Sequence, residues 1–227
     1  MRRVAFFDID GTLMTGGPAK DAFRTAMIDT FGTVGDIEGV SFGGKTDPQI
    51  ARELLSGIGY EVDLIEERFP LLWHYYAERL EHQLIRCPMQ VLPGVSELLN
   101  TLGGIDDIGV GLLTGNIARG AELKLGSAGL TEHFALGSYG SDHEEREQLS
   151  RIALERARDT WNPSLQPEHT VVIGDTPRDV LCGLKVGART LAVATGSFTV
   201  SQLAEAGADQ VVVNLTATDK IVSYLLA

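Results

Sequence analysis

The chain has 227 residues, of which 44% are hydrophobic, and its formal net charge is −12 at pH 7. This composition can fill the core of one domain with an insertion, whereas the negative charge makes nucleic acids and anionic membranes poor partners. We see neither a signal-peptide pattern nor an apolar run near the roughly 20 residues of a membrane helix. Because Cys87 and Cys182 form no CxxC motif, we expect free thiols and a cytoplasmic location.

The first predicted strand is Val4–Phe7, an apolar run that leads directly into Asp8 and Asp10. Such a short run is typical of a strand buried on both faces, and Gly11 permits a sharp turn after it. Carboxylates at the carboxyl end of a strand lie where open α/β sheets bind ligands. The alternative is an Asp-rich turn without chemistry.

The next part of the chain, residues 16–88, carries only helical apolar patterns and is bounded by Gly- and Pro-rich joints. Pro70 should kink or divide the last of its helices. We therefore expect an all-helical cap at residues 16–88, inserted into a discontinuous α/β core of residues 1–15 and 89–227. The apolar spacing predicts helices over Pro18–Phe31, Thr46–Ile58 and Val62–Leu80.

Beyond residue 88, predicted strands alternate with predicted helices. This alternation predicts a Rossmann-like parallel sheet with helices on both faces. The predicted strands are Ile108–Leu113, Phe134–Leu136, Thr170–Ile173, Thr190–Val193 and Gln210–Val213. The predicted helices are Val95–Leu102, Ile117–Ala128, Glu144–Thr160, Pro177–Val186, Val200–Ala206 and Thr216–Leu226.

Polar residues follow two further predicted strands. After the strand that ends at Leu113, the sequence Thr114, Gly115 and Asn116 offers a hydroxyl and backbone N–H groups at a helix start. That arrangement can cradle a phosphate, although a simple helix cap is the alternative.

The second polar segment contains Asp175 and Asp179, which lie four residues apart at the start of a predicted helix. Both carboxylates can therefore face one point, where they would suit a hard cation such as Mg²⁺. The alternative is a favourable interaction with the helix dipole. If the strands are neighbours, these segments and Asp8 form an acidic metal site beside a phosphate cradle.

In this order the motifs resemble those of the haloacid dehalogenase (HAD) superfamily. The helical insertion resembles the cap of its phosphoglycolate-phosphatase-like members, so the resemblance covers essentially the whole chain. It implies a parallel sheet and a phosphate-ester chemistry, because dehalogenating and phosphonate-cleaving members lack an acid at the second position of the first motif. The matching segments are Asp8-Ile9-Asp10-Gly11-Thr12, Thr114 and Gly174-Asp175-Thr176-Pro177-Arg178-Asp179.

The resemblance also implies roles for the acids. Asp8 would be the nucleophile and form an aspartyl-phosphate, while Asp10 would be the general acid and then the base for water. Mg²⁺ would be held by Asp8, by Asp175 and by the backbone carbonyl of Asp10. Asp179 would be either a further ligand or a residue that is hydrogen-bonded to a ligand.

The resemblance implies phosphoryl binding by Thr114 and the N–H groups near Asn116. The family usually has a lysine ahead of its last motif, but no lysine lies between residues 124 and 185. Arg146 is the best candidate for this position, with Arg151 and Lys124 as rivals. Otherwise Arg146 is a solvated helix charge.

The segment Gly39–Thr46 matches the P-loop pattern. A P-loop must follow a buried strand, and the preceding Gly32–Glu38 is too polar and too rich in glycine. We interpret the segment as a cap loop that brings Gly44 and Lys45 to the substrate. A surface lysine near a helix start is the alternative.

The sequence thus favours a Mg²⁺-dependent phosphatase acting on a small phosphorylated metabolite, such as phosphoglycolate or a sugar phosphate. A phosphomutase of the β-phosphoglucomutase type needs the same two acids of the first motif, so the motifs do not separate it from a phosphatase. A non-catalytic binding protein on this fold is the third hypothesis.

Overall fold

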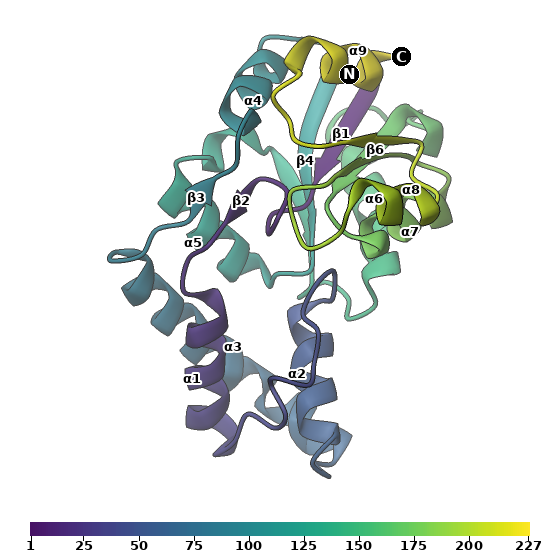
Figure 1. The fold of residues 1–227 in the computed structure, drawn as a ribbon. Coiled ribbons are helices and arrows are strands. Elements are labelled where there is room, and N and C mark those ends of the chain that lie inside the picture. The colour runs from purple at the N-terminus through teal and green to yellow at the C-terminus, as the bar shows by residue number, and fades with distance from the viewer.

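The computed structural model describes residues 1–227 and contains a six-stranded parallel sheet (Figure 1). Helices flank this sheet, which confirms the predicted Rossmann-like fold class. None of the helices combines the length and hydropathy that a membrane crossing requires. Across the sheet the strands are β5 (Leu136–Tyr139), β4 (Ile108–Thr114), β1 (Arg3–Phe7), β6 (Thr170–Gly174), β7 (Arg189–Val193) and β8 (Gln210–Val212).

Strand β1 lies at the centre of the sheet and is buried on both faces. Its alternate residues point to opposite sides, so Val4 and Phe6 share a core with α6 and α7, whereas Ala5 and Phe7 share one with α4 and α9. The core helices are α4 (Val95–Gly103), α5 (Ala118–Ala128), α6 (Arg146–Thr160), α7 (Pro177–Val186), α8 (Val200–Glu205) and α9 (Thr218–Leu226), with 3₁₀ turns at Thr131–His133 and Pro167–His169.

The helical insertion lies beyond the sheet and consists of α1 (Ala19–Phe31), α2 (Asp47–Ser56) and α3 (Val62–Leu84) (Figure 1). Helix α1 packs along α3. Two short strands, β2 (Met14–Thr15) and β3 (Gln90–Val91), pair antiparallel where the chain enters and leaves this insertion. Two-residue strands carry no periodic signal, so the sequence did not predict them. We call the insertion between β2 and β3 the cap.

Two predictions differ from the structure in detail. Pro70 does not divide its helix, since α3 is continuous from Val62 to Leu84, whereas a kink there stays a prediction. Burial of the apolar stripe on both sides of Pro70 outweighs the local cost of a proline. The strand predicted at Phe134–Leu136 is instead Leu136–Tyr139, because the Phe134 ring packs edge-on against Phe7 at 6.3 Å and belongs to the core beneath the sheet.

Candidate active site

The three polar segments meet at the carboxyl edge of the sheet, because β1 lies between β4 and β6. Asp8, Thr114 and Asp175 each follow or end one of these adjacent strands. The cap covers this edge and encloses a cavity of about 470 Å³. Asp8, Asp10 and Asp175 line the core side of the cavity.

A buried cluster of three carboxylates occupies one side of the site. Oxygen atoms of Asp8, Asp175 and Asp179 lie within 4.8 Å of one another. Burial, opposed by Arg146, raises the pKa of Asp8 to about 6. Burial and the charges of Asp8 and Asp179 raise the pKa of Asp175 to about 8. The cluster therefore holds more negative charge than its surroundings neutralise, which is the electrostatic requirement of a cation site.

Gly11 makes room for this cluster at the turn after β1. Its φ of 85° lies in the left-handed region, and a Cβ there would stand 2.4 Å from Asp175 Oδ2. Only glycine fits so close to the carboxylate.

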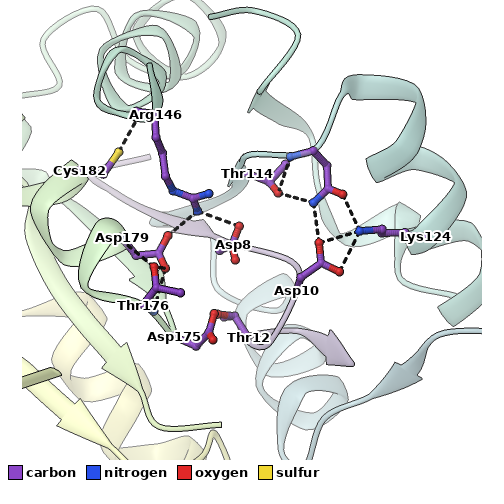
Figure 2. Close-up of polar contacts among 11 residues, drawn as sticks. Asp8, Asp10, Thr12, Thr114, Lys124, Arg146, Asp175, Thr176, Asp179 and Cys182 are labelled. Atoms are coloured by element: carbon purple, nitrogen blue, oxygen red, sulfur yellow. Dashed lines mark hydrogen bonds and ion pairs between the residues drawn. The ribbon is translucent and has the colours of Figure 1, made fainter. Parts of the chain in front are cut away.

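Arg146 begins α6 and bridges two of the acids (Figure 2). Its Nη2 donates to Asp8 Oδ1 at 2.9 Å and also contacts Asp179 Oδ1. The side chain is only 6% exposed, so it is not a solvated helix charge. Its rival Arg151 is exposed and bonds only to Gln148 on the same helix.

Asp179 is held more tightly than the other two acids. Its Oδ2 accepts from the backbone N–H and the hydroxyl of Thr176, at 3.0 and 2.7 Å. These bonds close the capping box at the start of α7. Because Arg146 takes the remaining oxygen, we expect Asp179 to support the cluster from behind.

Asp10 faces a separate pair of partners on the opposite side of the site (Figure 2). Lys124 Nζ lies 2.7 and 2.9 Å from its two oxygens, and Asn116 Nδ2 donates to Oδ2 at 2.8 Å. Desolvation opposes ionisation, but the charge and hydrogen bond of Lys124 and the hydrogen bond of Asn116 lower the pKa of Asp10. The two acids of the first motif thus lie in different electrostatic environments.

Sequence reasoning considered Lys124 only as a rival of Arg146. The structure places it against Asp10, with a third contact of 2.6 Å to Asn116 Oδ1. The sequence feature that could have pointed to Lys124 is its position on α5, where it shares the buried helix face with Ala121 and Leu125. A lysine on such a face is unusual unless it is paired.

The phosphate-sized cradle follows β4. The buried Thr114 Oγ1 accepts from the Asn116 backbone N–H at 3.3 Å and from its Nδ2 at 2.8 Å. Gly115 and Asn116 both line the cavity. Thr114 therefore orients Asn116, which in turn bonds to Asp10.

Comparison with known proteins agrees with this arrangement. Residues 146–218 match the family model of HAD-hydrolase-like proteins. The chain is 26% identical over 219 residues to the probable phosphatase IndB of Dickeya dadantii (strain 3937), covering 94% of this chain and 90% of that one. These similarities indicate a hydrolase enzyme that resembles HAD-like proteins.

Solved structures share the fold along the whole chain. A predicted phosphatase from Clostridium acetobutylicum superposes with a TM-score of 0.74 at 16% identity, covering 99% of this chain and 100% of that one. A predicted phosphoglycolate phosphatase from Haemophilus somnus 129PT superposes with a TM-score of 0.69 at 17% identity, with 98% of each chain covered. Together with the family model and the relative IndB, these structures bear out the resemblance to the HAD superfamily.

The P-loop-like segment lies between α1 and α2, in the cap, and the element directly before it is a helix, not a strand. Its Gly44 has a φ of 69°, and a Cβ there would lie 2.6 Å from Thr176 Oγ1. Lys45 lines the cavity, but its ammonium pairs with Glu53 on α2. The structure thus brings both residues to the site without leaving Lys45 unpaired.

Asp47 docks the cap against the phosphate cradle. Its backbone N–H donates to Gly115 O at 2.8 Å, and its Oδ2 accepts from the Ile117 N–H at 2.8 Å. Burial raises the pKa of Asp47 to about 6. The cap is therefore closed over the carboxyl edge.

Proposed function

We propose that the protein is a Mg²⁺-dependent phosphatase that hydrolyses a small phosphomonoester through an aspartyl-phosphate on Asp8. The observation that carries the proposal is the division of the acids: Asp8 lies in the carboxylate cluster, while Asp10 is held apart by Lys124. A nucleophile and a proton-transfer group need such different environments. The likeness to phosphatases supports the same chemistry.

The acidic cluster fits a hard divalent cation. Asp8 and Asp175 would hold Mg²⁺ together with the Asp10 backbone carbonyl, and Asp179 would support them. When bound, the ion would offset the repulsion between Asp8 and the incoming phosphate and would stabilise charge during transfer. The pKa values of Asp8 and Asp175 are raised by burial first and by neighbouring carboxylates second, and the charge of a bound cation would offset both effects.

The chain's own residues would act in two steps. In the first, an Asp8 oxygen attacks phosphorus and the bond to the leaving oxygen breaks. Asp10, which is a carboxylate beside Lys124 in the free protein, would take up a proton as the anionic ester binds and give it to the leaving oxygen. In the second, water attacks phosphorus, Asp10 takes the proton of the water, and Asp8 leaves with the bonding electrons. Thr114, the N–H groups at Gly115 and Asn116, and Arg146 would bind the phosphoryl oxygens. The Lys124–Asn116 pair would keep Asp10 in place during both steps.

The test is phosphate release from a panel of phosphomonoesters, with and without Mg²⁺. We expect release that EDTA abolishes and that the Asp8→Asn variant lacks. A folded wild-type protein that is inert with Mg²⁺ across the panel, or an Asp8→Asn variant with full activity, would overturn the proposal.

A phosphomutase remains the second candidate, because a protein from Thermotoga maritima assigned as a β-phosphoglucomutase shares the fold with a TM-score of 0.63 at 20% identity. Incubation with a sugar 1-phosphate distinguishes the two. A mutase yields the 6-phosphate, whereas a phosphatase yields the free sugar and phosphate.

A further inference from the structure

The cavity has two unlike ends. The core end is polar and carries the acids and the phosphate cradle, whereas the apolar lining residues all come from the cap. The apolar lining is contributed by Ala19, Phe23, Val40, Phe42, Ile50 and Tyr76.

Three aromatic rings form one rigid wall at the cap end. Phe23 of α1 stands edge-to-face with Phe42 at 6.0 Å between ring centroids and with Tyr76 of α3 at 5.8 Å. Phe23 and Tyr76 are buried in the cap core, so helix packing fixes their rings. A wall of this kind binds a flat apolar group but offers few hydrogen-bond partners to the hydroxyls of a sugar.

Three of the four cations that line the cavity, Lys45, Lys124 and Arg146, are largely buried and held in ion pairs. The fourth, Lys20, makes only an exposed contact of 3.6 Å with Glu38. A second anionic group on a substrate, such as a carboxylate or another phosphate, would therefore meet no buried unpaired cation and would lie near several carboxylates. Burying such a group without a partner is costly. The pairs are Lys20 with Glu38, Lys45 with Glu53, Lys124 with Asp10, and Arg146 with Asp8 and Asp179.

One polar group of the aromatic wall has no protein partner. The Tyr76 side chain is 2% exposed and lines the cavity together with Asp47 and Asp10, and its hydroxyl makes no hydrogen bond in the protein. Desolvation, followed by the charges of Asp47 and Asp10, raises its pKa. A buried hydroxyl beside an open cavity is a ready hydrogen-bond group for a ligand.

We infer that the substrate is a phosphomonoester whose alcohol carries an aromatic or similarly flat apolar group, has a hydroxyl near the ester and bears no second anion. This inference rests on the proposed phosphatase function and narrows its substrate class. The aromatic wall selects the flat group, the paired cations exclude a second anion, and Tyr76 binds the hydroxyl.

The test compares kcat/KM for 2-phenylethyl phosphate, 2-phosphoglycolate and glucose 6-phosphate. All three release a primary alcohol, so their intrinsic reactivities are similar. We expect the aromatic ester to be preferred by about tenfold or more, as is typical of one well-filled apolar pocket. Equal values, or a preference for either of the other two esters, would overturn the inference while leaving the phosphatase intact. If the protein is inert toward all three esters and also toward a wider panel of phosphomonoesters, the proposed function itself is overturned.

Substitutions in the cap test which residues cause the preference for the aromatic ester. Phe42→Ala should reduce the ratio of kcat/KM for the aromatic ester to kcat/KM for glucose 6-phosphate by about tenfold. Phe69→Ala is the matched control, because Phe69 is also a half-buried cap aromatic but packs against Trp73 outside the cavity. If both variants change the ratio of the two esters equally, the wall does not select the substrate.

The hydroxyl is tested separately with 2-hydroxy-2-phenylethyl phosphate. Tyr76→Phe should remove the advantage of this ester over 2-phenylethyl phosphate, a change of about 2- to 10-fold in the ratio of their kcat/KM values. An advantage that persists in Tyr76→Phe would overturn the role of Tyr76.

Discussion

The two ends of the cavity are built in different ways. At the core end, the segments that follow β1 and β6 carry every acid of the proposed chemistry, and the segment after β4 carries the phosphate cradle. At the cap end, a loop and two helices provide aromatic rings. The sheet fixes the first set to its edge, whereas packing between α1 and α3 fixes the second.

This difference separates the reaction from the choice of substrate. The strand ends hold charges that must act on any phosphomonoester, so changes there should affect all esters alike. The cap contacts only the rest of the substrate, so changes there should alter the ratio between esters. The following predictions test that separation in order of expected effect.

The largest effect should come from Asp8→Asn, which keeps the shape of the side chain and removes its nucleophilic charge. We expect kcat to fall on the order of 10⁴-fold or more for every ester tested, since no other group can take the phosphoryl. Steady-state phosphate release measures this, and circular dichroism checks the fold. A loss confined to one ester would contradict a shared reaction centre.

Arg146→Met should destabilise the protein in the absence of Mg²⁺. The change leaves Asp8 and Asp179 buried without their shared cation, and removing one partner of such a group costs about 3–5 kcal/mol. Urea unfolding in EDTA measures the free energy of unfolding. The control is Arg151→Met, an exposed position on the same helix. Equal stabilities for the two variants would show that Arg146 does not bridge the acids in solution.

Lys124→Met should lower kcat while changing KM little, because Lys124 holds Asp10 and is not expected to bind the ester. Hydrogen bonds to a charged group are worth about 1.5–3 kcal/mol, so the loss should be about 10- to 100-fold. Lys185→Met is the control, since Lys185 pairs with Glu147 on the surface. An unchanged kcat in Lys124→Met would mean that Asp10 acts without this partner.

The smallest effect concerns pH and Mg²⁺. In the metal-free protein the pKa of Asp175 is raised to about 8, so the folded state keeps a proton that the unfolded chain releases above about pH 4. The stability of the metal-free protein should therefore fall as pH rises from about 4 to 8. Binding of Mg²⁺ needs the carboxylate, so the increase in Tm caused by Mg²⁺ should be larger at pH 8 than at pH 6. Thermal melts at both values measure it, and Asp175→Asn should lose the response. An equal increase at both pH values would contradict this coupling.

The fold and the core end could be predicted from the sequence because β1, β4 and β6 are each an apolar run that stops at a polar cluster. Val4–Phe7 before Asp8 is the clearest example, and the parallel sheet then brings such ends together. The position of Lys124 against Asp10 was not predicted, since it depends on how α5 turns relative to β1. Which residues could surround Mg²⁺ follows from the motifs, although their roles stay predictions.

Much less of the cap end of the cavity could be predicted from the sequence. Its helices follow from apolar spacing, but Phe23 and Tyr76 lie on the same stripes that build the cap core, so their sequence pattern does not distinguish packing from binding. The pairing of Lys45 with Glu53 likewise depends on how the loop docks onto the core. Long-range packing, and not local propensity, decides these contacts.

The most direct test of the account is a rapid-quench experiment on the wild-type protein with Mg²⁺ and a phosphomonoester that it hydrolyses. The reaction is stopped in acid within the first turnover, and the phosphorylated peptide is sequenced by mass spectrometry. The account predicts a phosphoryl group on Asp8 that appears before free phosphate and decays as phosphate is released. Phosphate release without any phosphorylated protein, or a phosphoryl group on another residue, would contradict it.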